Sequence, residues 1–354
     1  MKLMVVIPTW NRAEYLNKAI GAIASARAKA SQYCEVELFV SNNCSTDHTA
    51  EVLAQWQKNA PWVYGHNWEV HSENWQEILS RAFNGSGRDY DYAWLQGDDD
   101  WITDSTAYAQ LMEAVEADPS NLPAIVHCCA ARRAIPGDSR IVSGLTEELC
   151  NIYGWHDLLG WISSLVISRT TVDRMLASPQ FAMLPGSSYS HAEALLEAAY
   201  GQCMLVMGAG LIDPQDDTQT PECIERWAKA GVGRGYWGVI PGLLNLKARG
   251  VMKTPLTVTF FRYLTYSFWD RFAVEVMSIV LRPDVSDDLI ETKLAMLDHF
   301  ASLLGYGEDR KLYETWLEGF TDDVWDIRRA MNLLQKRITS SNRPSYSINL
   351  FSSG

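Results

Sequence analysis

Short apolar runs alternate with amphipathic segments along the first 130 residues of the chain. A continuous apolar run, typical of a strand buried on both faces, occupies Leu3–Ile7. Mostly apolar runs predict further strands at Val36–Val40, Tyr90–Leu95 and Ala124–Cys128, with a shorter one at Trp62–Tyr64. Between them, apolar residues recur every three or four positions, which predicts helices at Arg12–Lys29, after Asp47, at Glu73–Phe83 and at Asp104–Ala117. This order predicts an α/β fold with a doubly wound, mostly parallel sheet. In such sheets, ligands bind beyond the carboxyl ends of the strands.

The pattern changes in the second half of the chain. Two more strands are predicted at Leu165–Ser168 and Met204–Met207, with a helix at Ala192–Tyr200 between them. The polar, proline-bounded segment Asp213–Pro221 predicts a boundary, and helical patterns alone follow it. We therefore predict one domain at 1–215 and an all-helical C-terminal domain at 216–354. The second would serve contacts with an acceptor, a membrane surface or another copy of the chain in a homo-oligomer.

The composition of the chain argues against several classes of function. The net charge of −13 argues against nucleic-acid binding, which needs clustered cations. The seven cysteines form no CxxC pair, so neither a disulfide framework nor a structural zinc site is expected. The apolar start is too short for a signal peptide, and no run of about 18 apolar residues occurs, so we expect a cytoplasmic protein. A basic cluster that would suit the inner face of a membrane, or simply a solvated helix face, comprises Arg328, Arg329, Lys336, Arg337 and Arg343.

Three consecutive carboxylates, Asp98, Asp99 and Asp100, follow the predicted strand that ends at Leu95. Grouped carboxylates repel one another, and a divalent cation relieves that repulsion. Carboxylate oxygens suit Mg²⁺ or Mn²⁺, which in turn can bridge to a diphosphate and stabilise it as a leaving group. The alternative is a solvated acidic turn before the next helix. The position at the carboxyl end of a strand favours the metal site.

Two polar turns follow the first two strands. The first, Pro8-Thr9-Trp10-Asn11-Arg12, can present backbone groups and the Trp10 ring to a planar ligand. Alternatively, it is a plain turn with Asn11 as a helix cap. The second, Ser41 to Asp47, also lies at the predicted binding edge, where Asp47 plausibly caps the following helix.

Together these segments resemble family 2 glycosyltransferases with a GT-A fold. Strands of that family end in patterns like I-P-T-Y-N-R, V-S-D-N-C-S-T-D-G-T and L-x-x-D-D-D, and this chain reads Ile7–Arg12, Val40–Thr49 and Leu95–Asp100. The resemblance covers about residues 1–213. It implies an inverting, metal-assisted transfer of a sugar from a nucleoside-diphosphate sugar to a glycan or lipid-linked glycan. Bacterial enzymes of O-antigen and capsule synthesis are of this kind.

The resemblance also implies roles for individual residues. The donor would contact Pro8, Thr9, Trp10, Asn11, Arg12, Asn42, Asn74, Asp98 and Asp99. Asp98 and Asp100 would hold Mn²⁺ or Mg²⁺. Two positions depart from the family pattern: Asn42 stands where Asp is usual, and His48 where Gly is common. Because an amide still forms hydrogen bonds, a UDP- or dTDP-sugar remains the favoured donor.

Fewer sequence features point to the residues that would bind and activate the acceptor. The family often has a Glu-Asp pair near the start of a helix after the acceptor loop, where this chain has His191 and Glu193. Either could be the base that deprotonates the acceptor hydroxyl, and His191 could instead cap the helix. Trp155 and Trp161 could stack on an acceptor sugar or belong to the core.

Two other functions are compatible with parts of this pattern. A nucleotidylyltransferase would need a Gly-rich phosphate loop after the first strand, and the turn from Pro8 to Arg12 contains no Gly. A non-catalytic member that only binds glycans or a partner stays open, because Asn42 is atypical and the Glu-Asp pair is missing. The intact Asp98–Asp100 triplet counts against that alternative.

Overall fold

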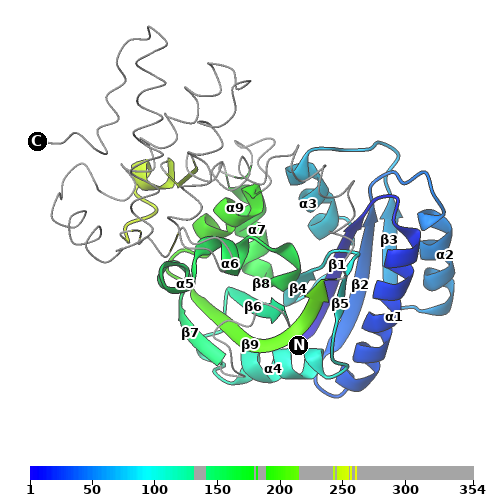
Figure 1. The fold of residues 1–354 in the computed structure, drawn as a ribbon, viewed down its shortest axis with the longest axis horizontal. Coiled ribbons are helices and arrows are strands. Elements are labelled where there is room, and N and C mark those ends of the chain that lie inside the picture. The colour runs from blue at the N-terminus through cyan, green and yellow to red at the C-terminus, as the bar shows by residue number, and fades with distance from the viewer. Residues whose placement is uncertain are drawn as a thin grey trace, which may run out of the picture.

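A computed structural model describes residues 1–130, 141–178, 181 and 189–214, and a few positions beyond them at 242–243, 245–254, 256 and 260. A single mixed sheet forms the centre of this part of the chain, with helices on both faces (Figure 1). The strand order is β3-β2-β1-β4-β8-β6-β9-β5, and β7 pairs with β9 beside this path.

The first half of the domain is a regular β–α alternation. Its elements are β1 (Lys2–Thr9), α1 (Ala13–Ala30), β2 (Glu35–Asn42), α2 (Thr49–Asn59), β3 (Val63–Asn67), α3 (Trp75–Asn84) and β4 (Tyr92–Leu95). All pairs among β1, β2, β3 and β4 are parallel, so these four strands end at the same edge of the sheet. This edge is where the polar turns and the acidic triplet follow the strands.

The second half extends the sheet with antiparallel pairs. Its elements are β5 (Asp100–Ile102), α4 (Ala107–Glu116), β6 (Ile125–Ala130), β7 (Ile141–Leu145), α5 (Thr146–Tyr153), α6 (Trp155–Leu159), the 3₁₀ turn η1 (Ile162–Ser164), β8 (Leu165–Ser168), α7 (Arg169–Ala177), α9 (Ser190–Ala198) and β9 (Cys203–Pro214). β8 runs antiparallel to β4 and to β6, whereas β6 and β9 are parallel. The long β9 also pairs with the short β5, which holds the segment after the acidic triplet against the sheet.

Alternation along the strands divides the core into two layers. Leu3, Val5 and Ile7 of β1 face α1, α2 and α4, whereas Met4 and Val6 face α3, α6, α7 and α9. Both faces of β1 are therefore apolar and covered, which explains why its sequence reads as one continuous apolar run.

The predicted α/β fold with its parallel N-terminal strands is confirmed. Two strands were missed, β5 and β7, as were helices α5, α6 and α7. The first strand also continues through Pro8 to Thr9, two residues further than predicted. The predicted boundary begins where β9 ends, at Pro214. The helical C-terminal domain lies almost wholly outside the described residues and stays a prediction. Among the described helices, none is both long and apolar enough to cross a membrane.

Candidate functional site

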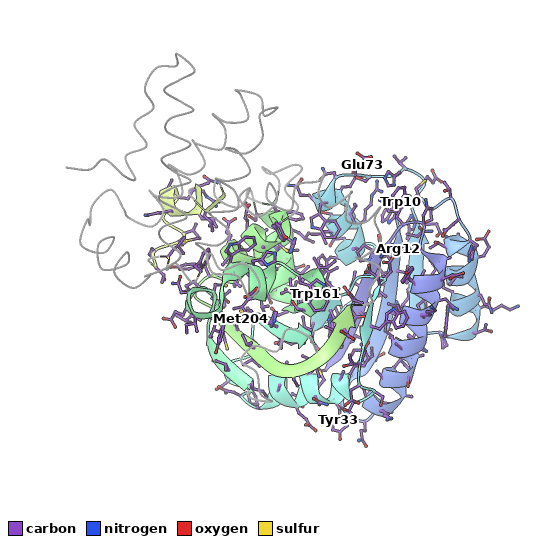
Figure 2. The ribbon with its side chains drawn as sticks, viewed as in Figure 1. Trp10, Arg12, Tyr33, Glu73, Trp161 and Met204 are labelled. Carbon is purple, nitrogen blue, oxygen red and sulfur yellow. The ribbon has the colours of Figure 1, made fainter. Side chains whose placement is uncertain are left out.

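Polar side chains gather where the parallel strands end. The register places Thr9 of β1 beside Asn42 of β2, and Asn42 beside Asn67 of β3. On the other side of β1, Leu95 of β4 lies opposite Val6. The acidic triplet follows Leu95 in the sequence and therefore lies next to Thr9. In Figure 2 the labelled Trp10, Arg12 and Glu73 mark this end of the domain, and Tyr33 marks the opposite end.

Asp98 is buried and bonded to the last residue of β1 and to the turn that follows it. The Thr9 hydroxyl donates a hydrogen bond to one Asp98 oxygen at 2.6 Å, and the Arg12 guanidinium donates to the other at 2.9 Å. The same Arg12 nitrogen lies 2.5 Å from Asp99. Burial by itself lowers the pKa of Arg12, but Asp98 and Asp99 outweigh it and raise that pKa. One permanent cation is thus shared between two carboxylates of the triplet.

Asp100 is held by a different part of the chain. It is the first residue of β5, and it is buried. The Ser163 hydroxyl of η1 donates a hydrogen bond to Asp100 and accepts one from the amide of Gly97 at 2.8 Å. The Trp161 side chain also hydrogen-bonds to Asp100. The turn around the triplet is therefore closed by residues more than 60 positions further along the chain.

Both buried carboxylates resist ionisation. Burial raises the pKa of Asp98 to about 6, opposed by Arg12 and Thr9. Burial and the charge of Asp99 raise the pKa of Asp100 to about 7, opposed by Ser163. If Asp98, Asp99 and Asp100 are all ionised at neutral pH, the single guanidinium of Arg12 does not neutralise their charge. The cluster therefore favours a further cation.

The donor set fits a divalent metal bound together with a phosphate ligand. Within the part of the chain that the structure describes, no three His, Cys, Asp or Glu side chains form a ready-made metal site. Mg²⁺, however, usually binds through one or two carboxylates plus the phosphates of its substrate. Asp98 and Asp100 supply hard oxygen ligands of this kind.

The turns after β1 and β2 brace each other. Asn11 has a positive φ of 54°, and its side-chain oxygen accepts hydrogen bonds from the amides of Thr46 at 2.7 Å and Asp47 at 3.4 Å. In return, Asp47 accepts from the amide of Ala13 at 3.2 Å. Asn11 is therefore a structural brace in this structure, which fixes the turn that carries Trp10 and Arg12.

Other predicted donor-binding residues border the same edge. Trp10 is 47% exposed, and its ring centroid lies 4.6 Å from that of His71. Asn42 is only 1% exposed, whereas its neighbour Asn67 is exposed. Asn74 is exposed at the start of α3, where its side chain accepts from the amide of Gln76. The edge thus offers one exposed aromatic face and a row of amide side chains.

The sequence of this chain was compared with models of known protein families. Residues 4–173 match the sequence model of Glycosyl transferase family 2. This segment, just under half of the chain, is similar to that family. It contains the ends of β1, β2, β3 and β4, the acidic triplet and the serine that supports it.

Curated relatives match over about a third of this chain. The abequosyltransferase RfbV of Salmonella typhimurium is 31% identical over 121 residues, which are 33% of this chain and 34% of that protein. The validoxylamine A glucosyltransferase of Streptomyces hygroscopicus subsp. jinggangensis is 28% identical over 127 residues, 36% of this chain and 28% of its own length. The matched stretches thus span about a third of these relatives.

Solved structures share the fold. Residues 1–349 of S. aureus TarS superpose with a TM-score of 0.53 at 11% identity, covering 86% of this chain and 81% of that one. The same protein in complex with UDP gives a TM-score of 0.54 at 12% identity. At this identity the likeness shows the fold alone, which is the GT-A fold.

The two residues predicted as acceptor base are buried. His191 is 2% exposed on α9, and both its ring nitrogens are engaged. The Trp75 indole donates to Nδ1 at 3.2 Å, so the proton is on Nε2, which lies 3.0 Å from the carbonyl oxygen of Leu159. Burial lowers the pKa of His191 to about 4. Glu193 is also fully buried. Neither side chain reaches the surface in this structure, and the assignment of one of them as the acceptor base stays a prediction.

The two tryptophans predicted to bind the acceptor lie in different surroundings. Trp155 is 0% exposed and lies in the core beside Tyr189, so its predicted stacking on an acceptor sugar is wrong for this structure. Trp161 is partly exposed and bonded to Asp100, which places it at the border of the acidic triplet. Of the two, Trp161 alone lies where a bound sugar could meet it.

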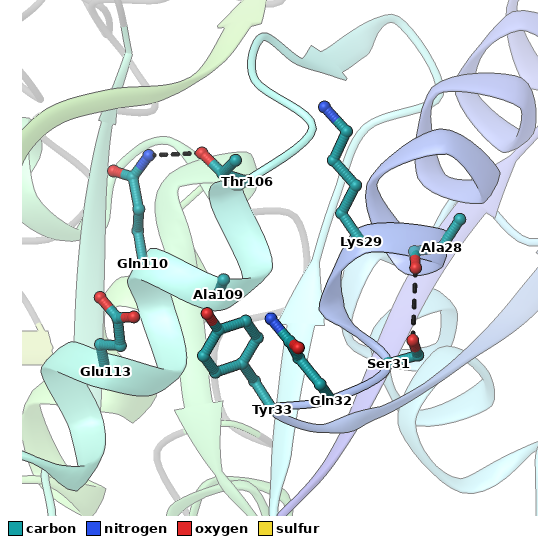
Figure 3. A pocket seen from close by; sticks show the side chains of 9 residues that line it. All are labelled: Ala28, Lys29, Ser31, Gln32, Tyr33, Thr106, Ala109, Gln110 and Glu113. Carbon is teal, nitrogen blue, oxygen red and sulfur yellow. Dashed lines mark hydrogen bonds between the residues drawn. The ribbon is translucent and has the colours of Figure 1, made fainter.

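A hollow of about 560 Å³ lies away from this site. It is bordered by the end of α1, by Tyr33 and by α4, as Figure 3 shows. Tyr33 lies two residues before the start of β2, so the hollow is at the edge where the strands begin. Because the triplet and the polar turns all follow strand ends, this hollow is separate from the candidate site.

Proposed function

We propose that this protein is an inverting glycosyltransferase that moves a sugar from a nucleoside-diphosphate sugar to a glycan or lipid-linked glycan, assisted by Mn²⁺ or Mg²⁺. The observation that carries the proposal is the pair of buried carboxylates, Asp98 and Asp100, beside Thr9 and Arg12 at the carboxyl edge of the sheet, in a segment similar to family 2 glycosyltransferases. The names of the curated relatives, both sugar transferases, support it.

Each side chain at the edge has a role in this proposal. Asp98 and Asp100 would hold the metal, which when bound neutralises the charge that develops on the leaving diphosphate. Arg12 exchanges its carboxylate partners for diphosphate oxygens, since a guanidinium binds both with the same fork of donors. The exposed face of Trp10 is a platform for the nucleobase. The acceptor approaches on the side of Trp161.

The transfer is tested with a panel of nucleotide-sugars, incubated with the full chain in the presence of Mn²⁺ or of excess EDTA. We expect slow hydrolysis of one donor class, lost in EDTA, and an anomeric configuration opposite to that of the donor when the product is read by NMR. Retention of configuration, or full activity in EDTA, would refute the mechanism.

A second function, nucleotide binding without transfer, is favoured by the burial of His191 and Glu193. A binding protein would take up a nucleoside diphosphate with Mn²⁺ and release no sugar from any donor of the panel, with or without glycan acceptors. Turnover of any donor above the rate of the Asp100→Asn variant excludes this function.

Replacement of Arg12 by Met should have opposite effects on metal and nucleotide. The variant removes the cation that competes for Asp98 and Asp99, so Mn²⁺ alone should bind more tightly, by a factor on the order of ten. A nucleoside diphosphate added with Mn²⁺ should bind more weakly, because its phosphates lose a charged donor. Calorimetry measures both. The exposed Arg174→Met on α7 is the matched control, and equal shifts in both variants would contradict the role of Arg12.

A further inference from the structure

We infer that the hollow between the end of α1 and α4 is a second binding site, which takes a neutral oligosaccharide. The hollow lies at the edge of the sheet where the strands begin, whereas the proposed transfer takes place where they end. The inference goes beyond the proposed function, because a glycan in the hollow is held there without reacting. It rests on that function only for the source of the glycan, which is the chain that receives the sugar.

The hollow is formed by elements that are fixed in the fold. Its volume of about 560 Å³ falls within the range of about 300–1,000 Å³ that is typical of small-molecule sites. One wall is the last turn of α1 together with residues 31–33, and the other is a face of α4 (Figure 3). The small side chain of Ala109 contributes to the space between the two walls.

Tyr33 gives the hollow an aromatic face. Of the Trp, Tyr and Phe side chains that the structure describes, Trp10 and Tyr33 are the most exposed, at 47% and 41%. The backbone amide of Tyr33 donates to the carbonyl oxygen of Ala30 at 2.8 Å, and the next residue, Cys34, is buried. The backbone that carries the ring is therefore held in place. Such a ring can stack on the apolar face of a sugar at a low cost in conformational entropy.

The polar groups of the hollow include both donors and acceptors. Gln110 and Glu113 are three positions apart and therefore lie on the same face of α4. The Gln110 amide donates to the Thr106 hydroxyl at 2.8 Å, which orients it. Within the described part of the chain, the side chains of Gln32, Tyr33 and Glu113 make no hydrogen bond to another protein group. Sugar hydroxyls, which both donate and accept, can satisfy an amide, a phenol and a carboxylate together.

The charges of the hollow favour a ligand without charge. Its lining contains one cation, Lys29, and one carboxylate, Glu113. The Lys29 ammonium already donates to the Ser105 hydroxyl. A second carboxylate, that of Asp104, accepts from the Gln110 amide at 3.4 Å. A phosphate group would meet one cation that is shared with a hydroxyl and two carboxylates, on a chain whose net charge is −13, so a nucleotide fits poorly.

The hollow is one helix length away from the acidic triplet. α1 begins directly after Arg12, which binds Asp98, and its last turn lines the hollow. Its 18 residues span roughly 27 Å. Only a chain of several sugars can therefore occupy the hollow and the transfer site at once. A second site on the same protein raises the local concentration of such a long acceptor without a change in the reaction.

A glycan array incubated with the full chain, without donor or metal, tests the inference. The probes are oligosaccharides of glucose, galactose, mannose and rhamnose, beside phosphorylated and uronic-acid glycans. We expect binding to at least one neutral oligosaccharide. Tyr33→Ala should weaken this binding by about tenfold or more, whereas Tyr33→Phe keeps the ring and should retain most of it. Trp10→Ala, at the opposite edge, should bind the array like the wild type.

A second pair of variants tests the polar groups. Glu113→Gln should weaken binding by about fivefold, because a sugar hydroxyl donates a stronger hydrogen bond to a carboxylate than to an amide. Glu116→Gln, exposed on the same helix outside the hollow, is the matched control and should bind normally.

Three results would overturn the inference. They are no binding to any neutral oligosaccharide, tighter binding to the charged glycans, and unchanged binding in Tyr33→Ala or Glu113→Gln proteins that unfold at the wild-type temperature. None of these results bears on the proposed function, which is judged by turnover of nucleotide-sugars with and without Mn²⁺.

Discussion

Asp100→Asn should remove metal-dependent nucleotide binding and lower sugar transfer by a factor on the order of 10³ or more. The amide has the size of the carboxylate and can still accept the hydrogen bond from Ser163, so the turn should keep its shape. What is lost is one of the two anionic ligands proposed for the metal, whose stabilisation of a leaving diphosphate amounts to several kcal/mol. Each 1.4 kcal/mol of lost transition-state stabilisation costs about tenfold in rate.

Thermal unfolding separates this effect from a folding defect. Without metal, Asp100→Asn should unfold at the same temperature as the wild type or higher, because burial already disfavours the ionised carboxylate there. Mn²⁺ with the nucleotide should raise the unfolding temperature of the wild type and leave the variant unchanged. Asp118→Asn, in an exposed loop, is the matched control. A normal metal-dependent shift in Asp100→Asn would exclude the triplet as the metal site.

The parts of the fold that could be predicted are those with strong local patterns. β1, β2, β4 and β6 are short apolar runs because their residues are covered on both faces of the sheet. β5 has three residues, begins with the polar Asp100, and is a strand only because β9 lies beside it. β7 alternates between exposed and partly buried residues and likewise depends on pairing with β9. A pairing partner 58 or more positions away leaves no local signal.

The parts of the candidate site that follow strands with a clear apolar pattern could be predicted. The parts that depend on contacts between distant segments could not. Asp98 and Thr9 each follow a strand that the apolar pattern reveals, and parallel pairing brings them into contact. Ser163 was missed, because nothing in the sequence around it indicates that it bonds to Asp100. The burial of His191 could not be predicted either, since it depends on Trp75 and Leu159 from two other elements.

His191→Gln should change the pH dependence of stability far more than it changes transfer. Inside the protein the imidazole is neutral, with a pKa of about 4, whereas its ordinary value is 6.5. Between these pH values the unfolded chain binds more protons than the folded one, so stability must rise with pH. The contribution of neutral His191 is complete above pH 6.5 and lost as the pH falls to 4, by roughly 3 kcal/mol in total.

Glutamine keeps an acceptor for the Trp75 indole and a donor for Leu159 but does not titrate. The variant therefore removes the effect of protonation at this position while keeping the hydrogen bonds. The free energy of unfolding, measured by denaturant at pH 4, 5, 6 and 7, should rise less steeply with pH in the variant than in the wild type. Asp98 and Asp100, whose raised pKa values act in the opposite direction over part of this range, are present in both proteins and cancel in the difference. Turnover at pH 7 should stay within about tenfold of the wild type, whereas loss of a general base costs about 10²–10⁴. Parallel stability curves together with a hundredfold loss of turnover would return His191 to the role of base and show that α9 opens during the reaction.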